Sequence, residues 1–247
     1  MSKQRQLIAA VDMGSSSFRM IVARVEELNG QSQIYIIDTL REPVRLGAGL
    51  NAQKYLDDAS QERALGALSR FGERLRSFKP GEVRAVATNA VRVARNAVEF
   101  IGKAEAALGF PIDVISGVEE ARLVYCGVAH QLPIGQGKRL VVDIGGGSTE
   151  FIIGEDYEPE AMESLYIGCV STAQQYFADG SISPRAMKNA VMAARKEVAV
   201  LQSLEATMSV VIIYDLDKLT GGGGGDDDED GGDDNGGSSG SWNAGRG

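Results

Sequence analysis

Residues 142–150 constrain this chain most strongly, because three consecutive glycines join two apolar runs there in the order Val-Asp-Ile-Gly-Gly-Gly-Ser-Thr-Glu. Two short apolar runs separated by small residues are typical of a β-hairpin. A turn without Cβ atoms lets backbone N–H groups approach a ligand closely, and consecutive N–H groups form a concave anion site. Asp143 and Glu150 would flank a phosphate in that turn, which suits a bridging divalent cation.

The same pattern occurs earlier in the chain. Residues 11–17 match residues 142–148 as Val-Asp-x-Gly-x-x-Ser, 131 positions apart, and both copies follow an apolar run. Internal repetition at this distance favours a duplicated architecture. Two readings are open: two unrelated turns, or two equivalent lobes whose phosphate-binding hairpins face each other across a cleft.

The composition is that of a globular protein, with 43% hydrophobic and 24% charged residues. The net charge of −9 comes mostly from the end of the chain, because nine acidic and two basic residues follow position 207. The first 207 residues carry 25 acidic and 23 basic residues, a net charge of −2. A body so close to neutral has no broad basic field, so we expect no nucleic-acid partner.

The location of the protein is predicted from what the sequence lacks. Cys126 and Cys169 have neither a metal-binding nor a redox spacing, which favours reduced thiols in a reducing compartment. No signal peptide and no apolar run of membrane-spanning length is present, so we expect no transmembrane segment. The prediction is a cytoplasmic protein, with peripheral membrane association and homodimer formation left open.

Periodicity and turn signals predict an alternation of strands and helices. In the first half we expect strands at 7–12, 18–25, 34–40, 83–87 and 112–115, and helices at 58–78, 88–95, 96–108 and 119–129. Asn29-Gly30 marks a hairpin turn. Asp58 with Gln61, Asn96 and Ser116 are the expected helix caps. From 139 onward we expect a strand, the glycine hairpin and a second strand, then a strand at 161–167, helices at 170–177 and 184–204, and a strand at 209–214.

This order predicts the fold class. An antiparallel meander followed by alternating strands and helices gives a mixed sheet with helices on its faces, as in a ribonuclease-H-like lobe. The prediction is an α/β protein with duplicated ribonuclease-H-like lobes of the actin-like ATPase type, the second lobe incomplete. We expect a first lobe at 1–132, a partial second lobe at 139–219 and a disordered Gly/Asp-rich tail at 220–247.

Three segments together resemble a known family. They are residues 12–20, residues 116–123 with the sequence Ser-Gly-Val-Glu-Glu-Ala-Arg-Leu, and residues 142–150. In this order and spacing they resemble the exopolyphosphatase and guanosine pentaphosphate phosphohydrolase family of the actin, sugar-kinase and chaperone-ATPase superfamily. The resemblance extends over about residues 7–204, and residues 88–92 and 166–171 also look like family segments.

The resemblance implies a Mg²⁺-dependent phosphohydrolase that removes terminal phosphate from inorganic polyphosphate. It places Glu120 at the position of the catalytic glutamate, which orients the attacking water. It implies that Asp143 and Glu150 hold Mg²⁺, assisted by Asp12. The phosphate-binding residues would be those of the two turns and one arginine: Gly14, Ser15, Ser16, Ser17, Gly145, Gly146, Gly147, Ser148 and Arg92.

Each of these residues also has a plainer interpretation. Without the resemblance, Glu120 reads as a solvated glutamate in the first turn of a helix, where its charge complements the helix dipole. Asp143 reads as the end of a strand, and Arg92 as an exposed helical arginine whose planar fork nevertheless suits phosphate oxygens. Glu119 is the expected surface residue of the Glu119-Glu120 pair.

Other functions remain open at this stage. Guanosine pentaphosphate is the alternative substrate within the same class. An actin-like nucleotide-binding protein or kinase, or a truncated non-catalytic remnant, are the alternatives from other classes. The sequence departs from the family in two respects: Ser16 stands where an Asn is usual, and residues 208–247 lack the later glycine-rich segment and closing helices. We therefore expect weak or no exopolyphosphatase activity from this chain.

Overall fold

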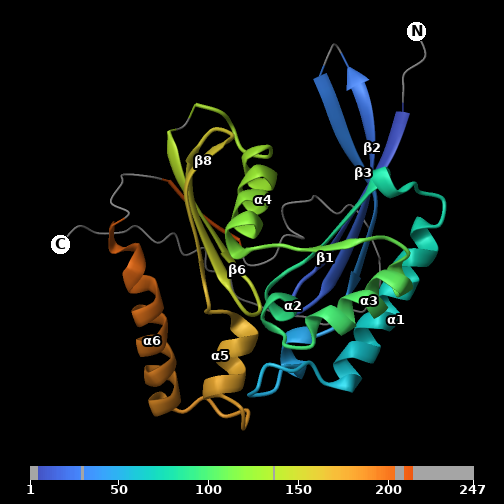
Figure 1. Cartoon of the computed structure of the whole chain (residues 1–247). Coiled ribbons are helices and arrows are strands. Elements are labelled where there is room, and N and C mark those ends of the chain that lie inside the picture. Colours follow the sequence, from blue (N-terminus) through green and yellow to red (C-terminus); the bar gives the residue numbers. More distant parts are fainter. Residues whose placement is uncertain (1–4, 29–30, 136, 204–208, 214–247) are drawn as a thin grey trace, which may run out of the picture. The chain divides into compact units, whose positions relative to one another are not determined.

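The computed structural model describes residues 5–28, 31–135, 137–203 and 209–213, which belong to one compact unit (Figure 1). Within these residues the first sheet has the strand order β3-β2-β1-β4-β5. Its strands are β1 (Arg5–Met13), β2 (Phe18–Leu28), β3 (Gln31–Glu42), β4 (Val83–Ala87) and β5 (Ile112–Val114). β1, β2 and β3 are antiparallel neighbours, whereas β4 lies parallel to β1 and β5 parallel to β4.

The second sheet has the order β8-β7-β6-β9 and follows the same plan. Its strands are β6 (Lys138–Ile144), β7 (Thr149–Glu155), β8 (Glu158–Leu165) and β9 (Ser209–Ile213). β6, β7 and β8 form an antiparallel meander, and β9 lies parallel to β6 just as β4 lies parallel to β1. The predicted fold class, duplicated ribonuclease-H-like lobes with mixed sheets, is confirmed.

The two glycine hairpins are equivalent residue by residue. Asp12 pairs with Arg19 across β1 and β2, and Asp143 pairs with Glu150 across β6 and β7. A four-residue turn joins the strands in both cases. A Cβ placed on the first glycine of either turn would lie 3.0 Å from the carbonyl oxygen of the turn's last serine. The repeated sequence pattern therefore reflects repeated backbone geometry, and two unrelated turns are excluded.

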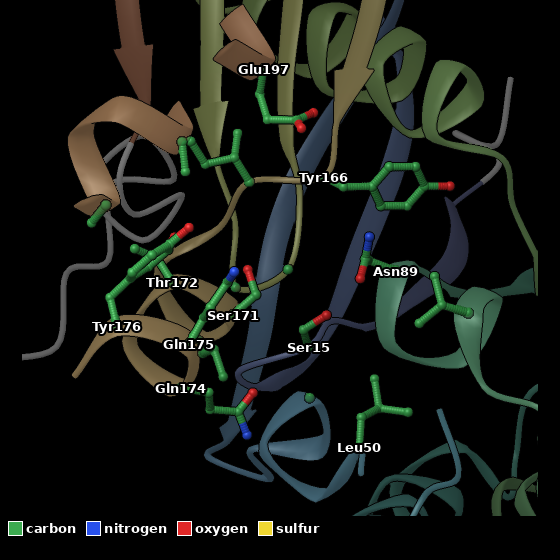
Figure 2. Close-up of a pocket in the computed structure, with 18 of the residues that line it drawn as sticks. Ser15, Leu50, Asn89, Tyr166, Ser171, Thr172, Gln174, Gln175, Tyr176 and Glu197 are labelled. Atoms are coloured by element: carbon green, nitrogen blue, oxygen red, sulfur yellow. The ribbon is translucent and has the colours of Figure 1, made fainter. Parts of the chain in front are cut away.

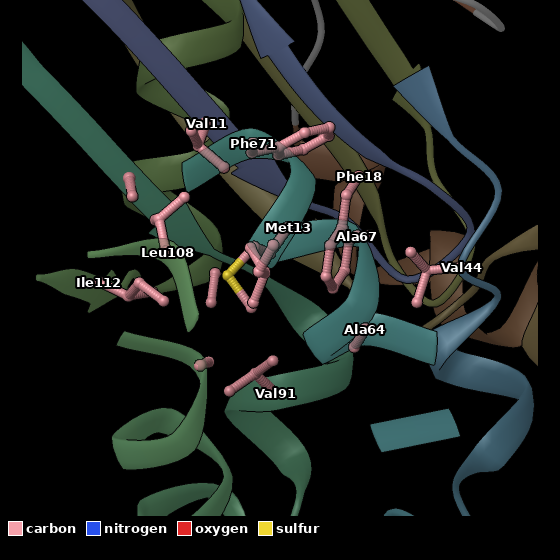
Figure 3. Close-up of a cluster of buried hydrophobic side chains, with 14 of the residues drawn as sticks. Val11, Met13, Phe18, Val44, Ala64, Ala67, Phe71, Val91, Leu108 and Ile112 are labelled. Atoms are coloured by element: carbon pink, nitrogen blue, oxygen red, sulfur yellow. The ribbon is translucent and has the colours of Figure 1, made fainter. Parts of the chain in front are cut away.

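The helices of the first half are α1 (Asp58–Leu75), α2 (Asn89–Val93), α3 (Ala97–Leu108) and α4 (Gly117–Ala129), with short 3-10 helices η1 (Leu46–Gly49) and η2 (Pro80–Glu82). α1 packs against α3, and both bury apolar side chains against the first sheet. Figure 3 shows Phe71 of α1, Met13 of β1 and Leu108 of α3 within this core. Since side chains alternate along a strand, Asp12 lies on the opposite face from Val11 and Met13.

The remaining helices are α5 (Cys169–Tyr176) and α6 (Pro184–Val198), followed by the 3-10 helix η3 (Ala199–Ser203). α4 packs against β6, β7 and β8, although it follows the first sheet in sequence. The face of the second sheet that α4 covers contains Val141 and Ile152, which are both fully buried. Because side chains alternate along a strand, Asp143 and Glu150 lie on the same face. The site residues of the second hairpin therefore lie on the side covered by α4.

Two helix caps differ from the prediction. Asp57, not Asp58, caps α1 by accepting from the backbone N–H of Ser60, while Gln61 donates to the carbonyl of Leu56. Asn96 stands at the N-terminus of α3, but its side chain bonds both the N–H and the carbonyl of Leu56 instead of capping the helix. The first difference is a shift of the cap by one residue, whereas in the second a partner 40 positions away competes for the Asn96 side chain. The Ser116 cap of α4 is confirmed, since its hydroxyl accepts from the N–H of Glu119.

Most element boundaries shift by a few residues. The strands β2 and β3 are longer than expected, and the predicted helix 184–204 divides into α6 and η3. The Asn29-Gly30 turn and the tail at 220–247 lie outside the described residues. Among the described helices, none combines the length and apolar character needed to cross a bilayer.

The packing of α1 on α3 gives a test within one helix. A Cβ on Gly72 would lie 2.7 and 2.8 Å from the carbonyl oxygens of Leu108 and Ala107, whereas at Gly66 the nearest atom is the flexible end of Arg70 at 3.6 Å. We expect Gly72→Ala to lower the free energy of unfolding by about 1–3 kcal/mol through overpacking. Gly66→Ala should raise it by about 0.5–1 kcal/mol through helix propensity.

Urea denaturation of the two variants beside the wild type measures both changes. The packing described for α1 and α3 is contradicted if Gly72→Ala is as stable as Gly66→Ala.

Candidate active site

The two glycine hairpins face and touch each other. A Cβ on Gly146 would lie 3.1 Å from the Cβ of Ser15, and one on Gly147 would lie 3.3 Å from the Ser15 hydroxyl oxygen. Ser15 is buried at this contact, and Ser148 at the end of the second turn is buried as well, while Ser16 is partly exposed. The predicted juxtaposition of the two hairpins is therefore present, and small residues at the contact make it sterically feasible.

Backbone hydrogen bonds hold the turns in place from behind. The carbonyl oxygens of Ser15 and Ser16 accept from the N–H groups of Gly47 and Arg45, next to η1. In the second hairpin the carbonyl of Gly146 accepts from two N–H groups in the first turn of α5, at 2.8 and 3.1 Å, and that of Gly145 accepts from Cys169. The carbonyls of both turns are thereby directed toward the scaffold and away from a ligand. Ser17 accepts a hydrogen bond from Arg41.

Glu120 lies in the first turn of α4 and is mostly buried, unlike the solvated glutamate of the plainer interpretation. Its Oε2 accepts from Nη1 of Arg92 at 3.2 Å, and the side chains of both residues are less than one-fifth exposed. Arg92 also donates to the carbonyl of Ile115, and Thr88 donates to Glu120. With these contacts Arg92 is not an exposed helical arginine. Glu119, by contrast, forms an exposed ion pair with Arg122.

Glu150 is almost fully buried at the start of β7, and hydroxyl groups satisfy its carboxylate. Ser164 of β8 donates to its Oε1 at 2.8 Å, and Ser148 also donates to it. Ser164 is the cross-strand neighbour of Glu150 on the other side from Asp143. Three strands thus place Asp143, Glu150 and Ser164 side by side on one face of the sheet.

Gly117, the first residue of α4, allows the start of this helix to approach β8 closely. A Cβ at this position would lie 2.4 Å from the hydroxyl oxygen of Ser164 and 3.6 Å from Nη2 of Arg92. No larger residue allows this approach without displacing β8. The helix that carries Glu120 therefore contacts the strand next to Glu150 directly.

Four carboxyl groups of this site influence one another. Burial, followed by repulsion from Glu120, raises the pKa of Glu150 to about 7 and that of Asp143 to about 6. Water reaches Asp12, yet protein surrounds most of the side chain. This loss of hydration, together with repulsion from Glu120 and Asp143, raises its pKa to about 7 against the lowering effect of Arg19. Burial also raises the pKa of Glu120, against the lowering effect of Arg92. Carboxyl groups with perturbed pKa values at one place are typical of functional sites.

The chemistry of these ligands suits a hard cation. The available donors are carboxylate and hydroxyl oxygens, which Mg²⁺ prefers, and their mutual repulsion favours a positive charge among them. Within the described residues, no three His, Cys, Asp or Glu side chains are placed to hold a metal by themselves. Mg²⁺ commonly binds through one or two carboxylates together with substrate phosphates, so the residues fit a cation that arrives with its substrate.

A pocket of about 410 Å³ adjoins the hairpins. Ser15, Gly146, Gly147 and Asn89 form one wall, and Figure 2 shows Gln174, Gln175 and Tyr176 of α5 together with Tyr166 around it. Glu120, Asp143 and Glu150 do not line this pocket. Since Asn89 follows Thr88, which bonds Glu120, the pocket and the carboxyl groups meet at the start of α2.

Sequence reasoning missed three polar residues of the site: Thr88, Asn89 and Ser164. The segment 88–92 looked like a family segment, but only Arg92 carried a predicted role. Ser164 had no signal in the sequence, because its position beside Glu150 depends on the register of β8, which shifts between Ile153 and Gly154 of β7.

Comparison with known proteins assigns a family. Residues 21–211 match the Ppx/GppA phosphatase family. The chain is 43% identical to a putative exopolyphosphatase of Haemophilus influenzae over 191 residues, and 45% identical to a guanosine-5'-triphosphate,3'-diphosphate pyrophosphatase of Vibrio cholerae over 190 residues. Each match covers 77% of this chain. The chain spans 58% and 37% of the lengths of these two relatives.

Solved structures show the same fold. The Aquifex aeolicus PPX-GPPA enzyme matches with a TM-score of 0.67 and 29% identity, covering 85% of this chain and 68% of that one. An exopolyphosphatase-like protein matches with a TM-score of 0.76 and 27% identity, covering 86% of this chain and 66% of that one. A PilM–PilN type IV pilus complex matches at 13% identity with a TM-score of 0.56, which concerns the fold alone.

The raised pKa values predict how stability depends on pH. Because the folded-state pKa of Glu150 lies above its ordinary value near 4.5, its protonated form stabilises the fold below that value, and this contribution is lost as the pH rises through about 7. We expect Glu150→Gln, which keeps an acceptor for Ser164, to raise the Tm at pH 8 in the presence of a chelator. The Tm difference from the wild type should vanish at pH 4.

Thermal unfolding followed by circular dichroism measures this difference. Glu163→Gln, on the neighbouring exposed position of β8, is the matched control and should change the Tm at neither pH. A Glu150→Gln protein that is less stable than the wild type at pH 8 would show that burial of the charge is fully compensated.

Proposed function

Because the chain belongs to the Ppx/GppA phosphatase family, we propose that it hydrolyses a terminal phosphoanhydride bond, with inorganic polyphosphate as the substrate. The supporting observation is the position of Glu120, held between Arg92 and Thr88 beside the carboxyl groups of the second hairpin. Guanosine pentaphosphate is the second candidate substrate, supported by the name of the Vibrio cholerae relative. The relatives are longer, so the activity of the present chain is part of the proposal.

Glu120 acts as the general base in this proposal. Its carboxylate accepts a proton from the water that attacks the terminal phosphorus, while Arg92 and Thr88 fix its orientation. Burial raises the pKa of Glu120, which makes the carboxylate a stronger base, and the ion pair with Arg92 opposes that rise by favouring the ionised form. In this proposal Nη2 of Arg92, which lies near Gly117, would donate to a phosphoryl oxygen.

The hairpins bind the phosphate chain. The backbone N–H groups of residues 14–17 and 146–148 would surround the oxygens of the terminal phosphate, while the N–H of Gly145 donates within its own turn. The hydroxyl groups of Ser15, Ser16, Ser17 and Ser148 would add donors. Cleavage of a phosphoanhydride needs little covalent chemistry beyond positioning and charge neutralisation. The two facing turns supply positioning from both sides of the substrate.

Asp143 and Glu150 would hold Mg²⁺, assisted by Asp12, which faces them from the first hairpin. When bound, the cation would neutralise charge on the phosphate oxygens. Protonation of Asp143 or Glu150 competes with this role, since both have raised pKa values.

The proposal is tested by phosphate release from long-chain polyphosphate, guanosine pentaphosphate and ATP, assayed side by side. From this chain, which lacks the later segments of its relatives, we expect weak hydrolysis of polyphosphate, and Glu120→Gln should reduce it about 10²–10⁴-fold because the amide cannot accept the proton. Glu119→Gln, one residue away in the exposed ion pair, should change turnover less than twofold, as expected outside the site.

The pH profile adds a second criterion. Turnover by the wild type should fall as the pH drops through the raised pKa of Glu120, since the protonated form is not a base. Equal losses in the Glu119 and Glu120 variants would contradict the assignment of the base, and phosphate release from ATP alone would favour a nucleotide-binding function.

Cation binding can be tested without turnover. Millimolar Mg²⁺ should raise the Tm of the wild type at pH 8, because it relieves repulsion among the carboxylates. The increase should be much smaller in Asp143→Asn, and Glu163→Gln should behave like the wild type. An equal Mg²⁺ effect on all three proteins would place the cation elsewhere.

A further inference from the structure

Asn89 has a buried amide without a hydrogen-bond partner. It begins the short helix α2, and 6% of its surface is exposed. Its Nδ2 atom is sealed from solvent and bonds to no other atom among the described residues. Buried side-chain amides are almost always paired, because an unpaired donor has lost its hydrogen bonds to water without replacement. An unpaired amide at this depth therefore points to a missing acceptor.

The amide lies where the two hairpins meet. A Cβ on Gly147 would stand 2.4 Å from Oδ1 of Asn89, so this oxygen faces the second hairpin. Figure 2 shows Asn89 between Ser15 and Tyr166 at the edge of the pocket. The closed contact with Gly147 helps to exclude water from the amide. The nitrogen of the amide points the other way, toward Tyr166, so an acceptor at this edge of the pocket would reach it.

The surroundings indicate which kind of acceptor fits. Hydroxyl groups and glycine turns line the pocket next to Asn89, together with Lys54 and Lys196, while Glu197 is its acidic residue. Such donors and cations suit an anionic oxygen. Thr88, the preceding residue, bonds Glu120, so an anion at Asn89 would lie next to the proposed catalytic base.

We infer that the Asn89 amide binds a non-bridging oxygen of the phosphate chain as the chain passes between the hairpins from Glu120 toward the pocket. Asn89 is thus a substrate-binding residue that fixes the position of the chain relative to the base. The inference rests on the proposed function, because its ligand is the proposed substrate. It assigns a role to a residue that sequence reasoning did not select.

Binding of tripolyphosphate in the presence of Mg²⁺, measured by calorimetry with the full chain, tests the inference. Leucine has nearly the shape of asparagine, so Asn89→Leu removes the donor and the unpaired polar group together. We expect the Kd for tripolyphosphate to rise about tenfold or more, as for loss of a hydrogen bond to a charged group. Asn89→Asp should weaken binding further by charge repulsion.

Stability separates ligand binding from a packing role. The Tm of ligand-free Asn89→Leu should equal or exceed that of the wild type, because an unpaired buried amide is removed. Gln175→Leu, which replaces another pocket amide on the exposed surface of α5, should bind tripolyphosphate within twofold of the wild type. The side-chain N–H signals of Asn89 in ¹⁵N-labelled wild type should shift on addition of tripolyphosphate, which needs no variant to fold.

Three results would overturn the inference: unchanged affinity in Asn89→Leu, unshifted Asn89 side-chain signals at saturation, or a folded wild type that binds no tripolyphosphate. A wild type that hydrolyses polyphosphate while Asn89→Leu binds normally refutes this inference and leaves the proposed function intact. A wild type that binds tripolyphosphate through Asn89 but releases no phosphate from any substrate refutes the proposed hydrolysis and supports the inference.

Discussion

The loss of hydration at four clustered carboxyl groups, reinforced by their repulsion, is the constraint on which this site depends. Burial raises the pKa of Asp12, Asp143, Glu120 and Glu150, and repulsion from Glu120 raises those of the other three further. Guanidinium groups oppose this, Arg92 at Glu120 and Arg19 at Asp12. Such a cluster costs free energy in the absence of a cation, since each ionised group is poorly hydrated. The hydroxyl groups of Ser148 and Ser164 offset part of that cost at Glu150. The chemistry of such a site suits a ligand in which a cation is bound to phosphate oxygens.

The cluster forms because glycine residues stand where the two halves of the molecule meet. Gly117 lets the first turn of α4 approach Ser164, and Gly147 lets the second hairpin pack on Asn89 and Ser15. A single methyl group at either position would separate Glu120 from the carboxylates of the second sheet or force the backbone to move. The glycines of the motifs therefore have a packing role between the halves in addition to their place in the turns.

Sequence patterns predicted the features that depend on interactions between residues close together in the chain. The hairpins, the alternation that places Asp143 beside Glu150, and the Ser116 cap follow from residues within about ten positions of one another. The cap expected at Asp58 lies one residue earlier, at Asp57, whereas the cap expected at Asn96 failed because Leu56, 40 positions away, offers its side chain competing backbone groups. Ser164 and Asn89 were missed for the same reason, since their neighbours are fixed by strand register and by contact between the halves. Family resemblance supplied Glu120, which the sequence alone would leave as a surface residue.

The two halves contribute different chemistry to one site. The first supplies the proposed base and its guanidinium partner, Glu120 and Arg92, whereas the second supplies Asp143 and Glu150. α4 links them physically, because it carries Glu120 in its first turn and packs along its length on the second sheet. A change in the approach of the hairpins would alter the distance between base and carboxylates while leaving each group's own hydrogen bonds intact. Because the duplicated hairpins are similar in backbone and different in side chains, Arg19 opposite Asp12 and Glu150 opposite Asp143, the cleft between them is asymmetric in charge. If the chain acts as proposed, that asymmetry would give a bound phosphate chain a preferred direction, with its cation on the side of the second hairpin.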